Sequence, residues 1–159
     1  MLRTVYPAPC GTLYLVASDD ALCRASWHPL DIGEEGTNAV LDEARKQLDE
    51  YFAGTRREFD VPLCHAGTTE FQQRVWLVLK AIPYGTTITY KAEAAMLGNV
   101  KAIRAAAHAN ALNPLCIFVP CHRVIGANGS LIGYGGGLNN KIALLRIEGH
   151  HLTKTNLIQ

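Results

Sequence analysis

The chain has 159 residues, of which 48% are hydrophobic and 18% are charged, a composition that supports a folded core. Its formal net charge is only +1, which excludes attraction to nucleic acid through a global positive field and leaves a local basic or helix-terminus site. No apolar run approaches the ~20 residues that span a membrane. The five cysteines form no CxxC pair and no secretory signal follows Met1, so we expect a reducing, intracellular setting.

The first 66 residues predict a small domain that mixes strands with one helix. Residues 13–18 and 21–27 have the composition of strands, and two aspartates between them suit the tight turn of a hairpin. Apolar residues then recur at helical spacing from about 38 to 54, where a glycine ends the pattern. A short extended segment at 59–63 closes this domain, and we place its boundary between residues 66 and 67.

The remaining residues, 67–159, predict a mainly helical second domain. Thr68 or Thr69 is typical of a helix cap, and the helix that follows stops before Pro83. Two short helices over 90–97 and 100–112 flank a glycine-containing turn, which is the pattern of a helix-turn-helix. Further helix is expected over 141–147.

The second domain contains the most reactive pair of side chains, Cys121 and His122. An apolar run, 115–119, precedes them, and the pattern predicts a buried strand with the cysteine at its end. A nearby imidazole is the usual means of converting a thiol into a nucleophilic thiolate, and Glu148 is the best-placed carboxylate to orient the imidazole. Adjacent side chains of a strand point to opposite faces, so a Cys–His interaction needs a turn or a bridging water. A structural thiol beside a hydrogen-bonded histidine is the alternative.

Other side chains allow both a structural and a functional interpretation. Arg104 lies in an alanine-rich helix, where small neighbours would allow close approach to a DNA groove, but a solvated arginine is equally ordinary there. Tyr90 and Tyr134 are candidates for core packing or for a pocket, and Asn113 is expected to brace the cysteine segment through backbone hydrogen bonds. The cysteines and histidines of the first domain lack the spacing of a zinc motif, so no metal is expected.

The cysteine segment Pro120–Val124 reads PCHRV, and further short segments accompany it in a fixed order. They are Gln47–Gly54, Phe71–Trp76, Ile82–Gly85, Thr89–Tyr90, Lys101–Ala105, Asn113–Pro114, 133–137 and Leu144–Gly149. Together they resemble the O6-alkylguanine-DNA alkyltransferases, also called methylated-DNA–protein-cysteine methyltransferases. Residues 45–150 carry the resemblance strongly and the first forty weakly. Many motifs in order are more specific than any one of them.

The resemblance implies an α+β fold in which a small N-terminal α/β, ribonuclease H-like domain (1–66) precedes a mainly helical domain (67–159) with a winged helix-turn-helix. It also implies a DNA repair protein that moves the alkyl group of O6-alkylguanine, and also O4-alkylthymine, irreversibly to its own cysteine, once per molecule. The expected partner is double-stranded DNA, bound in the minor groove with the damaged base flipped out. The protein would be a monomer without a cofactor or membrane partner, cytoplasmic, or nuclear in a eukaryote.

The resemblance also assigns roles to individual residues. Cys121 would accept the alkyl group, His122 would act as its base through a water, Glu148 would orient His122, and Tyr90 would rotate the nucleotide and assist the departing guanine. The residues implied to bind DNA or to line the substrate pocket are Arg104, Ala105, Ala107, His108, Tyr90, Val124, Tyr134, Asn113 and Pro120.

The chain departs from the family pattern at several positions. Ala107 stands where glycine is frequent, His108 where a small residue is common, and the residues 91–93 after Tyr90 are unusual. These departures bear on DNA affinity and lesion preference more than on the chemistry.

Two other functions stay open from the residues alone. One is a helix-turn-helix DNA-binding module with a structural or redox-sensing cysteine, and the other is a Cys-His-Glu hydrolase, which would need an oxyanion hole.

Overall fold

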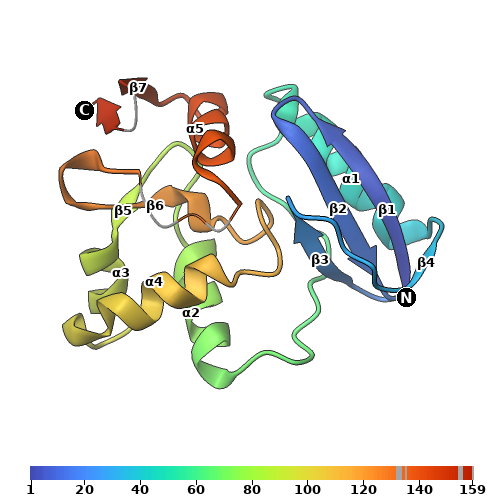
Figure 1. The fold of residues 1–159 in the computed structure, drawn as a ribbon, viewed down its shortest axis with the longest axis horizontal. Helices are drawn as coiled ribbons and strands as arrows, with labels where there is room; N and C mark the ends of the chain where they lie inside the picture. Colours follow the sequence, from blue (N-terminus) through green and yellow to red (C-terminus); the bar gives the residue numbers. More distant parts are fainter. Residues whose placement is uncertain (132–133, 135, 154–155, 159) are drawn as a thin grey trace. The chain divides into compact units, whose positions relative to one another are not determined.

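The computed structural model describes residues 1–131, 134, 136–153 and 156–158. The chain forms two compact units. The first comprises Met1–Ala66 and Pro114–Phe118, and the second comprises Gly67–Asn113 and Val119–Gln159 (Figure 1). The predicted boundary between residues 66 and 67 stays a prediction.

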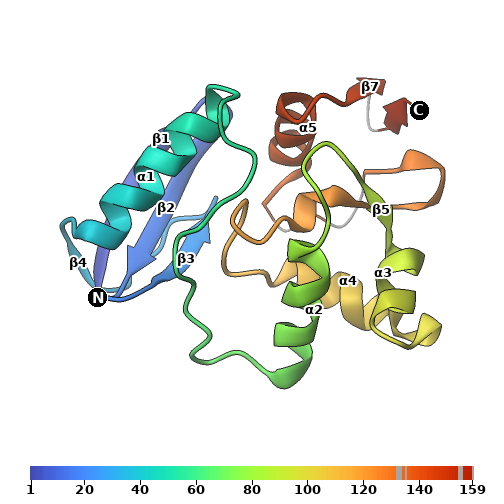
Figure 2. The ribbon, with the colours of Figure 1, turned by 180° about the vertical axis from the view of Figure 1, so that it is seen from behind.

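The first unit is a four-stranded sheet with a helix on one face (Figure 2). Its order is β3-β2-β1-β4, and its elements are β1 (Leu2–Ala8), β2 (Gly11–Ala17), β3 (Leu22–Ser26), β4 (Glu34–Glu35) and α1 (Ala39–Phe52). The hairpin predicted from residues 13–27 is confirmed as β2 and β3, which pair antiparallel. Strand β1 was not predicted. Its apolar residues do not alternate cleanly, since Val5 is exposed while Tyr6 is buried, and Pro7 interrupts the strand pattern.

The helix predicted over 38–54 is confirmed as α1. The side chain of Asn38 caps it by accepting a hydrogen bond from the Leu41 amide at 2.9 Å. Gly54, with φ +79°, follows the last turn and adopts the left-handed conformation that favours glycine. Fully buried Leu41, Leu48 and other apolar side chains of α1 face the sheet, which gives this unit an apolar core.

The second unit is mainly helical and contains the predicted helix-turn-helix. Its elements are α2 (Glu70–Lys80), β5 (Ile88–Thr89), α3 (Tyr90–Met96), η1 (Val100–Ala102), α4 (Ile103–Ala111), η2 (Cys121–Arg123), β6 (Val124–Ile125), η3 (Ala127–Gly129), α5 (Leu138–Ile147), β7 (His151–Thr153) and β8 (Asn156–Ile158). Thr69 and Gln72 form a capping box that starts α2. α3 and α4 pack against each other and against α2, and a 3₁₀ turn opens the predicted second helix.

The buried strand predicted before Cys121 is wrong. Leu115 makes a single bridge to Ala25, Ile117 has φ 74°, and no strand is assigned over 115–119. All five residues of this run are buried, so their apolar character reflects burial of an irregular segment and not strand pairing. The segment 133–137, which carries part of the family resemblance, lies partly outside the described residues.

Candidate active site

The thiol of Cys121 lies in the second unit, where η2 begins. Its residue is 4% exposed, and the Asn113 side chain donates from Nδ2 to Sγ at 3.1 Å. The same amide group donates to the Val119 carbonyl oxygen at 2.8 Å, so Asn113 joins the end of the helix-turn-helix to the cysteine segment. Asn113 was predicted to brace the cysteine segment through backbone hydrogen bonds, and its side chain also contacts the Cys121 sulfur directly. A donor aimed at sulfur favours the thiolate over the thiol.

His122 and Glu148 form a fully buried hydrogen-bonded pair. His122 Nε2 lies 2.6 Å from Glu148 Oε2, and Glu148 is the C-cap residue that follows α5. The other ring nitrogen, Nδ1, is buried and has no hydrogen-bond partner among the residues that the structure describes. Burial opposes ionisation of Glu148, but His122 and Arg123 outweigh burial and hold the pKa of this carboxyl well below its usual range. A permanently charged carboxylate is suited to orient and charge an imidazole.

Arg123 was not among the residues predicted for the site. Its guanidinium donates from Nε to Glu148 Oε1 at 2.7 Å and from Nη2 to Glu148 Oε2 at 3.1 Å, while Nη1 donates to the Ile82 carbonyl at 2.8 Å. Such a bidentate arginine fixes a carboxylate in position as well as in charge. The sequence carried a weak signal for it, since Arg123 follows a segment that is mostly apolar, and an arginine is almost never buried without a partner.

Lys141 of α5 is a second residue that sequence reasoning missed. Its side chain is fully buried, and Nζ donates to the Val124 carbonyl at 2.7 Å. The ammonium lies 5.7 Å from the centre of the Tyr90 ring. Burial lowers the pKa of Lys141 to about 8, and the charge of Cys121 acts in the opposite direction. Lys141 therefore places a cation in the electrostatic field of the thiol.

Tyr90 opens α3 and is half-buried. The parallel pairing of Ile88 with Val124 positions it, because this pairing joins the residues before α3 to those after Cys121. Burial, together with the charges of Cys121 and Glu93, raises the pKa of Tyr90 to about 12. The phenol is consequently a neutral proton donor at physiological pH.

One face of α4 is exposed and carries the residues implied to bind DNA. Arg104, Ala105 and His108 are exposed and Ala107 is half-buried, whereas Ala106, Ala109 and Asn110 are buried on the opposite side. Small side chains and two basic groups thus share the outer surface of this helix. A surface of this kind permits close approach to a nucleic-acid groove.

Comparison with known proteins decides the family. The model of the 6-O-methylguanine DNA methyltransferase DNA-binding domain matches residues 70–150, and that of its ribonuclease-like domain matches residues 1–64. The chain belongs to the 6-O-methylguanine DNA methyltransferase family. The family resemblance and the two-domain α+β fold predicted from the sequence are confirmed.

Several relatives match nearly the whole chain. The methylated-DNA–protein-cysteine methyltransferase of Methanosarcina acetivorans is 57% identical over 155 residues, which are 94% of this chain and 99% of the relative. That of Mycobacterium leprae is 47% identical over 150 residues, which are 91% and 90% of the two chains. The crystal structure of Mycobacterium tuberculosis OGT in complex with DNA has 42% identity and a TM-score of 0.85, covering 93% of this chain and 92% of that chain.

Three further residues of this methyltransferase-family chain were predicted to line the substrate pocket, besides Asn113. Pro120 and Val124 are buried on either side of η2, and Tyr134 is half-buried. Their predicted role in lining a base pocket stays a prediction. Among the described residues, no three histidine, cysteine or acidic side chains are grouped as metal ligands. No helix in the described part of the chain is both long and apolar enough to cross a membrane.

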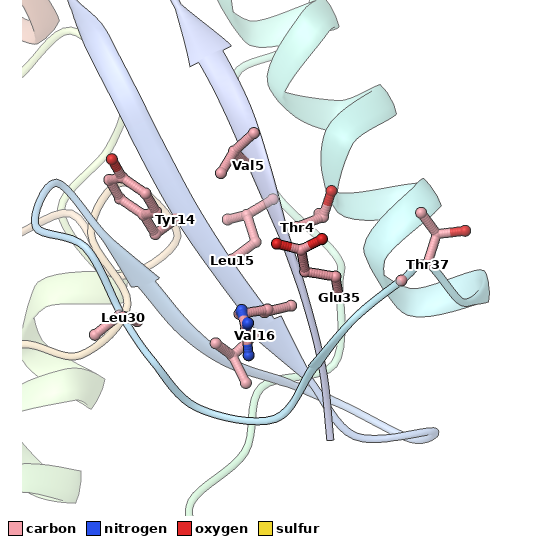
Figure 3. Close-up of a pocket in the computed structure, with 10 residues that line it drawn as sticks. Thr4, Val5, Tyr14, Leu15, Val16, Leu30, Glu35 and Thr37 are labelled. Atoms are coloured by element: carbon pink, nitrogen blue, oxygen red, sulfur yellow. The ribbon is translucent and has the colours of Figure 1, made fainter.

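A cavity of about 450 Å³ lies elsewhere, in the first unit. Figure 3 shows Val5, Tyr14 and Leu15 of the sheet around it, with Glu35 beside them. None of its ten lining residues is a cysteine or a histidine. The cavity therefore lacks the nucleophile and base that the second unit provides, and the candidate active site is the one around Cys121.

Proposed function

We propose that this protein repairs DNA by transferring the alkyl group of O6-alkylguanine to Cys121, once per molecule. The observation that supports this function best is the buried thiol itself, held 3.1 Å from the Asn113 amide in the same unit as the helix-turn-helix. A single-use nucleophile needs a thiolate, a base to create it and a donor for the leaving group. His122, Glu148 and Tyr90 supply the last two functions.

The transfer is a displacement at the alkyl carbon. His122 removes the thiol proton through a water at its open Nδ1, and the imidazolium is stabilised by Glu148, which Arg123 holds in place. The sulfur lone pair then forms the S–C bond while the C–O6 bond breaks and its electrons move to the guanine. Tyr90, neutral because its pKa is about 12, donates a hydrogen bond or proton to the departing base. The thioether product is a poor leaving group, so the protein is not regenerated.

The exposed face of α4 supports the proposed mode of DNA binding. Its alanines would approach the minor groove closely, Arg104 would fill the gap left in the base stack, and His108 would contact phosphate. Pairing energy limits how easily a base leaves the duplex, so a damaged and weakly paired guanine is favoured. We infer that the protein is a monomer in the cytoplasm, in keeping with its five cysteines without a CxxC pair and with its bacterial and archaeal relatives.

The test is transfer from an oligonucleotide duplex that carries O6-methylguanine. After incubation and proteolysis, mass spectrometry should find a mass gain of one methyl group on the peptide that contains Cys121, with one transfer per molecule. Cys121→Ser should abolish transfer and retain duplex binding. The matched control is Cys116→Ser, which removes another buried thiol and should transfer normally. A folded protein that binds DNA without any mass gain would instead support the alternative of a binding module with a structural cysteine.

A further inference from the structure

A buried carboxylic acid joins the two helices of the helix-turn-helix. Glu93 of α3 is 0% exposed and Asn110 of α4 is 4% exposed. Asn110 donates from Nδ2 to Glu93 Oε1 at 2.8 Å. No ion pair of Glu93 is found in the described part of the chain. An ionised carboxylate without a counter-charge is costly in such a site, whereas a neutral acid is not.

When Glu93 is ionised, the Glu93–Asn110 pair has one hydrogen-bond donor too few. Glu93 Oε2 and Asn110 Oδ1 are both buried and both without a partner among the described residues. Each is an acceptor when Glu93 is ionised, so neither can satisfy the other. A proton on Oε2 converts it into a donor, and the planar acid and amide groups can then exchange two hydrogen bonds. This assignment leaves no orphaned polar atom in the pair.

We propose that Glu93 is a positioning residue for base flipping: as the neutral acid it holds α3 against α4 through a reciprocal pair of hydrogen bonds with Asn110. The inference rests on the proposed function. Tyr90 lies one helical turn before Glu93, and His108 lies two residues before Asn110, on the exposed side of α4. The pair therefore links the helix that carries the proton donor to the helix that carries the DNA-contacting residues.

Loss of the proton removes one of the two bonds and leaves a negative charge facing the Asn110 carbonyl oxygen. Burial raises the pKa of Glu93 to about 7, and the Asn110 hydrogen bond opposes this shift. The folded pKa lies above the usual 4.5, so the clamp is fully formed below pH 4.5 and is lost as the pH rises through about 7. Ionisation should loosen the contact between the helices near neutral pH.

Among the described residues, the elements packed against α3 carry no buried counter-charge for Glu93. On α3 itself the other titratable groups are Tyr90, which stays neutral, and the exposed Lys91. α3 packs against α2, η1, α4, β5 and β6, and the two strands carry no titratable side chain. The charged or titratable residues of the three helices are all exposed, and they are Glu70, Arg74, Lys80, Lys101, Arg104 and His108.

The first test compares two substrates across pH. Single-turnover transfer is measured from an O6-methylguanine duplex and from the free base O6-benzylguanine at pH 5.5 to 8.5. The ratio of the two rates cancels titrations at the thiol, which both substrates share. In the wild type, the rate of duplex transfer divided by the rate of free-base transfer should fall by roughly fivefold to tenfold as the pH rises from 5.5 to 8.5. This is the effect of one buried hydrogen bond. Glu93→Gln forms an amide–amide pair at every pH, so its ratio should stay high and constant.

The matched control is Glu70→Gln, which neutralises an exposed glutamate of the same unit and should keep the wild-type pH profile. A wild-type ratio that is independent of pH, or a Glu93→Gln ratio that follows the wild type, would overturn the inference while the proposed function stands. Absence of transfer from both substrates would instead refute the proposed function.

A second measurement needs no variant. In protein labelled with ¹³C at glutamate carboxyl groups, the Glu93 resonance should titrate with a midpoint near 7. A Glu93 midpoint below pH 5 would show an ionised clamp and overturn the inference even if the glutamine variant failed to fold.

Discussion

The interiors of the two units differ in kind. The buried polar and charged side chains of the described chain are one in the first unit, Gln47, and seven in the second, namely Glu93, Asn110, Asn113, His122, Arg123, Lys141 and Glu148. The first unit therefore gains its stability from apolar burial, which is favourable and non-directional. The second unit buries charges whose desolvation is costly, and the cost is offset only where geometry is satisfied.

Under the proposed function, this contrast corresponds to a supporting role for the first unit and a chemical role for the second. A thiolate, an oriented imidazole and a neutral phenol need a dry environment with fixed dipoles, which an apolar core alone cannot supply. The polar interior of the second unit supplies it, at the expense of stability that an apolar core would have provided. Stability measurements on each unit can therefore test the assignment of function, and the largest effect is expected where a buried charge loses its partner.

The largest effect is expected from Arg123→Met. The substitution leaves Glu148 buried with two hydrogen bonds fewer, so the free energy of unfolding should fall by about 3–5 kcal/mol. Trp27 lies in the first unit and Trp76 in the second, so urea unfolding followed by fluorescence in a Trp27→Phe background reports the second unit. Because the folded pKa of Glu148 is depressed, the difference from wild type should be present above pH 4.5 and shrink as the pH falls.

The matched control for this change lies in the first unit. Arg56 pairs with Glu50 at 3.1 Å at the protein surface, and Arg56→Met should cost at most about 1 kcal/mol, in a Trp76→Phe background read through Trp27. Equal losses for Arg56→Met and Arg123→Met would contradict the view that the two units treat charge differently.

Much of the fold could be predicted from the sequence, and the part of the site that could not depends on tertiary contacts. Helix α1, the β2–β3 hairpin and the helix-turn-helix follow from periodicity and caps, which are local. The resemblance implied roles for Cys121, His122 and Glu148, and the structure brings the last two together 26 residues apart. Arg123 and Lys141 were missed because their partners, Glu148 and the Val124 carbonyl, are distant in sequence. Periodicity assigns a residue to a face but does not identify what it meets there.

A smaller effect is expected from Lys141→Met. The pKa of Lys141 is lowered by burial from 10.5 to about 8, so the unfolded chain binds its proton more readily between these values. The wild type should therefore gain about 3 kcal/mol of stability relative to Lys141→Met as the pH rises from 8 to 10.5. Urea unfolding of both proteins across this range measures the difference. Lys80→Met, at an exposed site, should show no such trend, and a constant difference for Lys141→Met would contradict a desolvated ammonium.

The smallest effect on stability, but a selective effect on function, is expected from Arg104→Ala. Arg104 is exposed on α4, so the free energy of unfolding should change by less than about 0.5 kcal/mol. Transfer from duplex O6-methylguanine should nevertheless slow by roughly tenfold, because unstacking a base costs a few kcal/mol that an inserted side chain partly offsets. Transfer from free O6-benzylguanine should stay unchanged. Lys101→Ala removes another exposed cation of the helix-turn-helix and should weaken duplex binding in a salt-dependent manner without this substrate selectivity. Equal slowing of both substrates by Arg104→Ala would place its role at the thiol and not in the base stack.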